Sequence, residues 1–177
     1  CSFAATPEVL RFWRKQGWQA VRLGLSKDMA TGCHAAVLLT GLQPESEAQL
    51  VFWQQQFQQQ LPVWLAQLLS ELSCDIILPL LQSPHAMSLT QQELADLTAF
   101  SDHHRSADHC WPAVLRLMQV SAEKLSQLPQ TQSAILIQRF WQGKSWGWLA
   151  QQHQLTGQKA VIQQLRLAVK KLLSLPG

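Results

Sequence analysis

The chain has 177 residues, of which 47% are hydrophobic and 14% charged, a composition that excludes an intrinsically disordered protein. Its net charge of +3 hides three blocks of different charge. Residues 1–27 contain five Lys and Arg and one acidic residue, 28–123 contain two Lys and Arg and ten acidic residues, and 124–177 contain seven Lys and Arg and no acidic residue. No apolar run approaches the roughly 18 residues that a membrane-spanning helix needs, so such a helix is excluded.

The first 42 residues predict a strand remnant, a helix and two further strands. Thr6 is a good N-cap, Pro7 suits the first helical position, and apolar residues then recur at helical spacing, so we expect a helix at about 7–16. Residues 18–25 alternate and 33–39 form an apolar run, and both patterns are typical of strands. We therefore expect the closing part of an α/β sheet whose earlier strands are absent.

From Pro44 the pattern becomes helical. Thr90 with Glu93 three residues later predicts a capping box. The 26 glutamines of the chain fall between regularly spaced apolar residues, which indicates the solvent faces of helices rather than a low-complexity segment. The expected helices are 45–60, a second helix opened by Pro62 and running to about 72, then 76–81, 90–100 and 112–120.

The last third predicts three more helices, at 132–142, 145–153 and 157–174. Ser145 is a suitable N-cap for the second, and a Thr-Gly pair at 156–157 makes the turn into the third. A helix, a short turn and a helix with an apolar inner face are typical of a helix-turn-helix-like bundle. The expected fold class is therefore α+β, a small sheet followed by a mostly α-helical domain.

Two motifs with possible chemistry are weak. Gly143-Lys144-Ser145 imitates the end of a phosphate-binding loop, but Gln138 stands where the loop needs its first glycine, and a helix precedes it where a strand is required. Residues 101–110 hold three His, two Asp and a Cys, which are metal-ligand types, but the stretch is more typical of a solvated connection between helices. We expect no metal site.

The cysteines bear on the cellular compartment, and the first residue bears on whether the chain is part of a longer protein. Cys1, Cys33, Cys74 and Cys110 lie far apart without a CxxC pair, which favours neither a zinc ribbon nor a disulfide framework, so we expect a cytoplasmic protein. Because the chain begins with Cys rather than Met, we also expect it to be a piece of a longer protein.

The acid-free basic end is the clearest functional signal. Lys159, Arg166 and Lys170 are spaced seven and four residues apart, so they share one helical face, and a one-sided cationic helix attracts a phosphate backbone. Helical spacing makes most of the eight tryptophans core residues, although one of Trp146 and Trp148 can be exposed for base stacking. A solvated helix that is basic by chance is the alternative. The predicted RNA-binding residues are Lys144, Lys159, Arg166, Lys170 and Lys171.

Both ends of the chain resemble a known family. The stretches SFAATPEVLRFWRKQGW at 2–18, VRLG at 21–24 and TGCH at 31–34 are similar to the end of the acetyltransferase domain of the bacterial tRNA(Met) cytidine acetyltransferase family. The stretches QGKSW at 142–146, LA at 149–150, LTG at 155–157 and LRLAV at 165–169 resemble the C-terminal end of the same family. The middle of the chain carries little of the resemblance.

The resemblance implies an enzyme that transfers acetyl from acetyl-CoA to the wobble cytidine of elongator tRNA(Met), forming 4-acetylcytidine, with ATP hydrolysed by an upstream module. Residues 1–42 would end a GNAT-type acetyltransferase domain, 43–130 would be a helical middle segment, and 131–177 a basic, RNA-binding tail. The family pattern makes Glu8, Lys15 and Arg14 cofactor-contact candidates, with ordinary solvated charges as the alternative.

The resemblance also leaves gaps. Trp13 stands where many GNAT enzymes have a tyrosine that protonates the departing thiolate, and no catalytic base is assigned, since neither Glu8 nor His34 is a convincing one. The loop that wraps the pyrophosphate of the cofactor is absent from the 177 residues, so this chain alone is expected to be inactive. The competing hypothesis is a non-catalytic, helix-turn-helix-like nucleic-acid-binding module.

Overall fold

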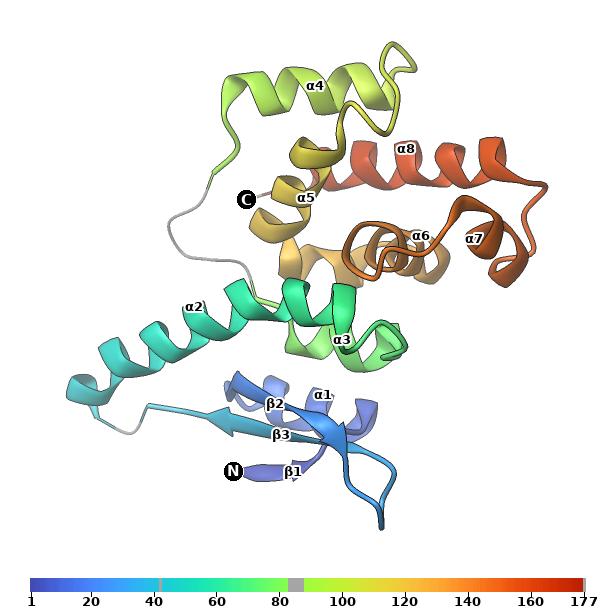
Figure 1. The fold of residues 1–177 in the computed structure, drawn as a ribbon. Helices are drawn as coiled ribbons and strands as arrows, with labels where there is room; N and C mark the ends of the chain where they lie inside the picture. The colour runs from blue at the N-terminus through green and yellow to red at the C-terminus, as the bar shows by residue number, and fades with distance from the viewer. Residues whose placement is uncertain (42, 83–87, 177) are drawn as a thin grey trace. The chain divides into compact units, whose positions relative to one another are not determined.

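The computed structural model describes residues 1–41, 43–82 and 88–176. They form two compact units, unit 1 over Cys1–Leu81 and unit 2 over Gln82–Gly177. Unit 1 combines a small antiparallel sheet with helices, and the described part of unit 2 is built from helices (Figure 1). The predicted α+β class is confirmed. The three-segment division predicted from the sequence concerns roles and stays a prediction.

Unit 1 opens with the predicted strand, helix and strand pair, seen as β1 (Ser2–Ala4), α1 (Pro7–Lys15), β2 (Gln19–Lys27) and β3 (His34–Leu39). β3 lies in the centre of the sheet, which has the order β1-β3-β2 and is antiparallel throughout. Ala36 of β3 pairs with Phe3 on one side and with Leu23 on the other. Because β3 is central, its Ala36 and Leu38 are fully buried.

The sequence signals around α1 work as predicted. The Thr6 side chain accepts a hydrogen bond from the Val9 N–H at 3.4 Å, and Pro7 takes the first position of the helix. Gly17 follows the C-cap with φ +81°, a left-handed conformation that glycine adopts at little cost. The chain therefore leaves α1 abruptly and enters β2.

Helix α2 (Pro44–Gln67) corrects one prediction, because Pro62 lies inside it and does not open a second helix. A proline inside a helix removes one backbone hydrogen bond and crowds the preceding turn. The apolar residues Phe57, Leu61, Leu65 and Leu69 continue at intervals of four past Pro62, and all four are buried. Their burial offsets the missing bond. Unit 1 ends with α3 (Cys74–Leu80), close to the predicted 76–81.

Two glutamines of α2 correct the expectation that glutamines face solvent. Gln54 is 8% exposed, and its Nε2 donates to Gln19 Oε1 on β2 at 3.3 Å. Gln58 Nε2 donates to the Leu80 carbonyl at 2.7 Å, which ties α2 to the end of α3. Periodicity could not separate these side chains from their solvated neighbours, because a partner from another element decides their burial.

Unit 2 contains α4 (Gln91–Ser101), α5 (Trp111–Val120), the 3₁₀ helix η1 (Ala122–Gln127), α6 (Gln130–Leu136), the π-helical η2 (Ile137–Trp141), α7 (Trp146–Gln152) and α8 (Gln158–Ser174). The long α8 packs against α4, α6 and α7 (Figure 1). Its buried stripe is Val161, Leu165, Ala168, Val169 and Leu172. Ile162 and Leu173, which the apolar spacing of the sequence also places on the inner side, are only half-buried, whereas Ala168 is buried.

The predicted helix 132–142 is one α-helix that changes into a π-helix. α6 ends at Leu136, and the wider turn of η2 is closed by a hydrogen bond of 3.0 Å from the Gln142 N–H to the Ile137 carbonyl. This extra residue in the turn brings both Phe140 and Trp141 into the core, at 6% and 3% exposure. Single π-turns of this kind are frequent at functional sites.

Among the residues that the structure describes, no helix is long and apolar enough to cross a membrane.

Candidate nucleic-acid interface

Next to the turn between η2 and α7, the guanidinium of Arg139 in η2 contacts two indole rings. The Cζ of Arg139 lies 4.5 Å from the centre of the Trp111 ring and 4.1 Å from that of Trp146. Arg139 Nη1 also donates to the Lys144 carbonyl at 2.9 Å, so the arginine fastens the turn to α5 and α7. Burial lowers the pKa of Arg139, opposed by the charge of Asp108. The half-buried Arg139 therefore links η2 to Trp111 of α5, to Trp146 of α7 and to the turn at Lys144.

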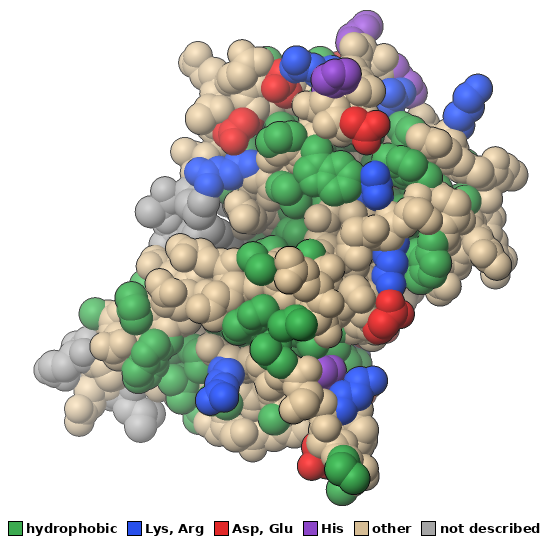
Figure 2. Space-filling model, in the orientation of Figure 1, with side chains coloured by type: hydrophobic (Ala, Val, Ile, Leu, Met, Phe, Trp, Pro, Cys, Tyr) green, Lys and Arg blue, Asp and Glu red, His purple; other side chains and the backbone are tan. Residues whose placement is uncertain are grey.

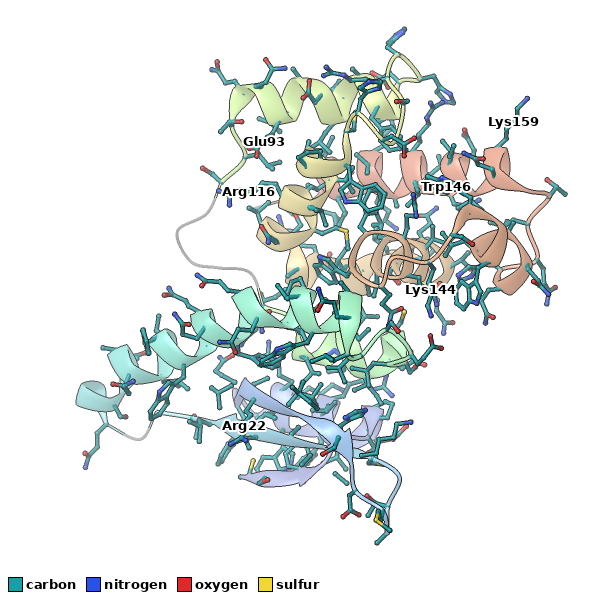
Figure 3. All side chains as sticks on the ribbon, viewed as in Figure 1. Arg22, Glu93, Arg116, Lys144, Trp146 and Lys159 are labelled. Carbon is teal, nitrogen blue, oxygen red and sulfur yellow. The ribbon has the colours of Figure 1, made fainter. Side chains whose placement is uncertain are left out.

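Lys144 is presented on this turn. Gly143 before it has φ +68°, and the Lys144 N–H donates to the Gln138 carbonyl at 2.8 Å, which fixes the backbone at the lysine. The ammonium lies 4.9 Å from the centre of the Trp148 ring, within the range of a cation–π contact. Figure 3 shows Lys144 and Trp146 at this corner of unit 2. A half-buried indole next to a cation suits a nucleotide, because a base stacks on the ring and a phosphate meets the charge.

The tryptophans correct a further prediction, because most of them are not core residues. Trp141 is buried, Trp53 is 45% exposed, and the other six are half-buried. Trp146 and Trp148 lie two residues apart on α7, and each has a cation over its ring. Helical spacing alone did not reveal this, because it places a ring on a face without showing whether the face meets a core or a cation.

Helix α8 carries the predicted cationic residues, and the structure divides them into two groups. Lys159 and Lys171 are exposed, and Figure 3 shows Lys159 extending away from the start of α8. Arg166 and Lys170 instead contact the loop after α4: Arg166 Nη1 donates to His103 Nδ1, and Lys170 Nζ lies 3.4 Å from Asp102 Oδ1. All four cations lie on the same helix, and they differ in whether they contact the loop after α4.

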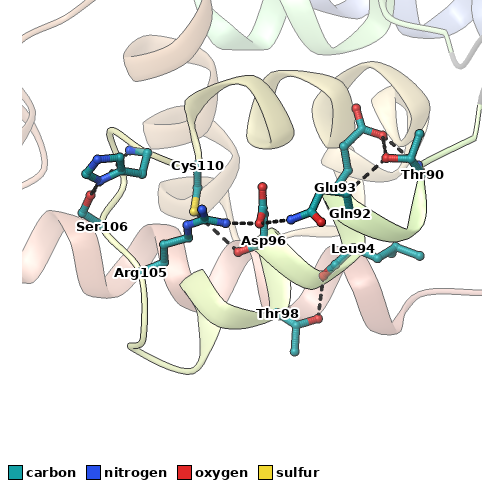
Figure 4. A network of polar contacts seen from close by, with 10 residues as sticks. Thr90, Gln92, Glu93, Leu94, Asp96, Thr98, Arg105, Ser106 and Cys110 are labelled. Carbon is teal, nitrogen blue, oxygen red and sulfur yellow. Dashed lines mark hydrogen bonds and ion pairs between the residues drawn. The ribbon is translucent and has the colours of Figure 1, made fainter.

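The His- and Asp-rich stretch 101–110 finds its partners within the protein. Arg105 pairs with Asp96 of α4, Ser106 lies 2.7 Å from His109 Nδ1, and Cys110 is buried with its thiol donating to the Asp96 carbonyl at 3.5 Å (Figure 4). Within the described ranges, no group of three His, Cys, Asp or Glu is placed to hold a metal ion. Figure 2 shows histidines, lysines and arginines gathered around this loop.

The predicted cofactor-contact residues all belong to α1 in unit 1, away from this interface in the chain. Glu8 is exposed and pairs with Arg11 at 3.6 Å. Arg14 donates to Gln19 Oε1 at 2.6 Å and to the Trp18 carbonyl at 3.2 Å, so it holds the start of β2. Lys15 is exposed at the end of the helix.

His34 has a structural environment. It is 7% exposed on the central strand of the sheet, and its Nδ1 donates to the Gly24 carbonyl at 2.8 Å. The backbone of Gly24 also lies close to the residue after His34, since a Cβ on Gly24 would be 3.4 Å from the Ala35 carbonyl oxygen. His34 therefore lies on the strand that the sequence predicts at 33–39.

Sequence reasoning missed the contribution of α5 and of the loop after α4. Trp111 holds Arg139, and Asp102 and His103 hold the cations of α8, although each lies more than 25 residues from its partner. The clustering of acids and histidines at 102–109, opposite in charge to the basic tail, was the available signal.

Comparison with known proteins gives a consistent result. Residues 48–175 match the model of a family described as a tRNA-binding domain, a stretch that covers most of unit 2 and, in unit 1, most of α2 and all of α3. Similar curated proteins carry the name tRNA(Met) cytidine acetyltransferase TmcA. The one from Nitrosococcus halophilus is 29% identical over 97% of this chain and 24% of its own length.

Two further relatives of that name show the same relation. The protein from Vibrio cholerae is 29% identical over 97% of this chain and 23% of its own length. The protein from Yersinia pestis is 32% identical over 72% of this chain and 18% of its own length. The chain thus spans about a quarter, or less, of the curated relatives that it matches.

Proposed function

Because the chain belongs to the tRNA-binding domain family, and its curated relatives are named tRNA(Met) cytidine acetyltransferases, we propose that it is the tRNA-holding part of an RNA acetyltransferase. The whole enzyme would transfer acetyl from acetyl-CoA to the amine of the wobble cytidine of elongator tRNA(Met), forming 4-acetylcytidine. An upstream module would hydrolyse ATP, and the enzyme would act in the cytoplasm.

The observation that carries the proposal is the cationic surface inside the matched region. Residues 124–177 contain no acidic residue, and Lys159 and Lys171 project from α8 into solvent. Lys144 lies on a turn whose carbonyl accepts a hydrogen bond from Arg139, and the Arg139 guanidinium contacts two indoles. Phosphates that meet these ammonium groups release condensed counterions, which favours binding without reading the base sequence. The proposed RNA-binding residues remain Lys144, Lys159, Arg166, Lys170 and Lys171.

The structure of unit 1 supports a role at the end of a GNAT-type sheet. β1, α1, β2 and β3 follow one another as the family resemblance requires, with α1 as the helix expected beside the cofactor. Acetyl-CoA, when bound, supplies an activated acetyl group and phosphates that need cationic partners. Lys15 is the favoured phosphate contact because it is exposed, whereas Arg14 already holds Gln19. Glu8 stays a candidate at the first turn.

Unit 2 supports the helix-turn-helix-like interpretation of the tail. α7 and α8 pack against each other across a turn in which Gly157 has φ +104°. Ser145 caps α7 by accepting a hydrogen bond of 3.2 Å from the Trp148 N–H, as predicted. We place the RNA on the outer face of α8 and at the Lys144 turn.

The test is kinetic and uses the full-length enzyme. A triple variant with Lys144→Gln, Lys159→Gln and Lys171→Gln should raise the KM for tRNA about tenfold or more, because surface contacts to phosphate contribute several-fold each, while the KM for acetyl-CoA stays unchanged. Lys15→Glu should give the reverse pattern. Lys27→Gln, an exposed lysine at the end of β2, is the control and should change neither constant.

Two results would contradict the proposal. An unchanged tRNA KM in the triple variant would remove the RNA-binding role of these lysines. A full-length protein that binds tRNA but transfers no acetyl group would favour the non-catalytic nucleic-acid-binding module instead.

A further inference from the structure

A hollow of about 290 Å³ lies in unit 2 between α8 and the end of α4. The α8 side chains Gln163, Arg166, Leu167 and Lys170 form one wall, and Ser101, Asp102 and His103 form the other. Six of these seven side chains are polar or charged, and two carry a permanent positive charge. A polar hollow with converging cations suits a small anion rather than an apolar ligand.

Arg166 is held in place before any ligand arrives. Its Nη1 donates to His103 Nδ1, its Nη2 donates to the Arg105 carbonyl at 3.4 Å, and its Cζ lies 5.5 Å from the centre of the Phe100 ring. None of these three partners is a carboxylate that would compete with an anion for the guanidinium. Arginine in such a position is well suited to phosphate, because its planar group offers several donors in a fixed geometry.

Lys170 is held only loosely. Its Nζ lies 3.4 Å from Asp102 Oδ1, and the lysine and aspartate side chains are 69% and 44% exposed. An exposed ion pair of this kind contributes little to stability. A phosphate that arrives with its own negative charge can therefore replace the carboxylate at small cost.

The two residues on the rim are not those that the fold by itself would favour. Asp102 is the C-cap of α4, where a carboxylate opposes the negative end of the helix dipole. His103 follows with φ +71°, and the N–H groups of His103 and His104 close the helix end on the carbonyls of Phe100 and Ala99, at 3.2 and 2.8 Å. Glycine is the usual residue at the left-handed position. Asp102 and His103 both contact cations of α8, Asp102 contacting Lys170 and His103 contacting Arg166.

We propose that this hollow binds one backbone phosphate of the RNA, and that Asp102 occupies the place of that phosphate in the free protein. The proposal rests on the proposed function, since it assigns a phosphate subsite to the same tRNA surface. Arg166 would be the fixed donor and Lys170 the exchangeable one. RNA binding would then swap the Lys170–Asp102 pair for a Lys170–phosphate pair, so that Asp102 weakens RNA binding at this point.

The proposal predicts opposite effects for the two partners of one ion pair. Asp102→Asn in the full-length protein should strengthen binding of tRNA about two- to fivefold, because the competing charge is removed. Lys170→Gln should weaken binding by a similar factor and should reduce the slope of log affinity against log salt by about 1. Affinities are measured by filter binding or fluorescence anisotropy over a salt series.

Control variants separate the subsite from general charge and from folding. Glu47→Gln, at an exposed position of α2, makes the same change in net charge as Asp102→Asn and should alter the affinity much less. The melting temperature of Asp102→Asn should equal or exceed that of the wild type, because the carboxylate is unfavourable at the helix end. With an unchanged or higher melting temperature, a change in the tRNA affinity of Asp102→Asn cannot be caused by partial unfolding.

The outcomes distinguish this proposal from the proposed function. If Asp102→Asn and Glu47→Gln have equal effects while Lys144→Gln and Lys159→Gln weaken tRNA binding, the subsite is refuted and the tRNA-holding role stands. If the wild-type protein does not bind tRNA, both fail. If Asp102→Asn strengthens binding of coenzyme A but not of tRNA, the hollow recognises another phosphate and the assignment to RNA is wrong.

Discussion

Single side chains decide which cations of this chain are available to a partner. Arg139, Arg166 and Lys170 belong to the same acid-free segment, but Arg139 lies between two indoles, Arg166 is fixed by a histidine and a carbonyl, and Lys170 has an exposed carboxylate partner. Lys159 by contrast extends into solvent. The sequence places all four in one basic block, and only their partners assign them different tasks.

The clearest residue-scale prediction concerns Arg139. Arg139→Lys keeps the charge but loses the planar group between Trp111 and Trp146, so we expect the free energy of unfolding to fall by about 2 kcal/mol. Chemical denaturation measures this change. Arg22→Lys, the same substitution at an exposed position of β2, should stay within about 0.5 kcal/mol of the wild type. Equal effects of the two substitutions would show that the indole contacts add no stability.

At the scale of elements, local signals predicted the helix starts, whereas burial decided how far the helices continue. Thr90 accepts a hydrogen bond of 3.2 Å from the Glu93 N–H, and Glu93 Oε2 accepts from the Thr90 N–H at 2.7 Å, so the predicted capping box is confirmed. The Thr90 N–H and the Thr90 hydroxyl both donate to Glu93 Oε2, and these two bonds, with a smaller contribution from Arg116, lower the pKa of Glu93 (Figure 3). Pro62 shows the opposite case, since a local helix-breaking signal loses to the buried stripe of α2.

The capping box gives a prediction with a control in the same helix. Thr90→Ala should reduce the free energy of unfolding by about 1 kcal/mol, because the Glu93 N–H loses its acceptor. Thr98→Ala is the matched control, since the exposed Thr98 hydroxyl only donates back to the Leu94 carbonyl at 2.8 Å, and its removal should cost little (Figure 4). A similar loss of stability in both variants would contradict the capping interpretation.

The same box has a defined pH dependence. Because the pKa of Glu93 is lowered from 4.5 in the folded protein, the carboxylate stabilises the fold above that pH and loses this effect as the pH falls through the lowered pKa. Glu93→Gln should therefore lose less stability than the wild type between about pH 5 and pH 3, measured by denaturation at both pH values.

On the scale of the whole molecule, the two basic blocks of the sequence lie in different compact units, while the acidic block 28–123 runs through both. Unit 1 carries the basic start with α1 and the sheet, and unit 2 carries the acid-free segment on η2, α7 and α8. Two acidic residues of unit 2 pair with cations of the same unit, Asp96 with Arg105 and Asp102 with Lys170. The exposed Lys159 and Lys171 of α8 are therefore the charges through which we expect unit 2 to bind a polyanion.

This arrangement predicts the salt dependence of tRNA binding. The logarithm of the affinity should fall linearly with the logarithm of the salt concentration, and Lys159→Gln with Lys171→Gln should reduce the slope by about 2, roughly 1 for each phosphate that is no longer bound. Lys27→Gln should leave the slope unchanged. A slope that is the same in the wild type and in both variants would mean that the outer face of α8 does not meet the RNA backbone.

By itself the sequence determined the elements of the sheet, the α1 cap, the capping box at Thr90, and the family, because each depends on residues that are close together in the chain. The Pro62 break, the solvent-facing Gln54 and Gln58, and the buried tryptophans were wrong for one common reason. Their environments depend on partners from other elements, which periodicity does not contain.

The tertiary structure alone decided that Arg139 is a half-buried cation in contact with two indole rings, and that Asp102 and His103 meet Lys170 and Arg166 at a hollow. Those contacts join residues more than 25 positions apart. Only the packing of α8 against α4, and of the η2 turn against α5, brings these charges within reach of their partners.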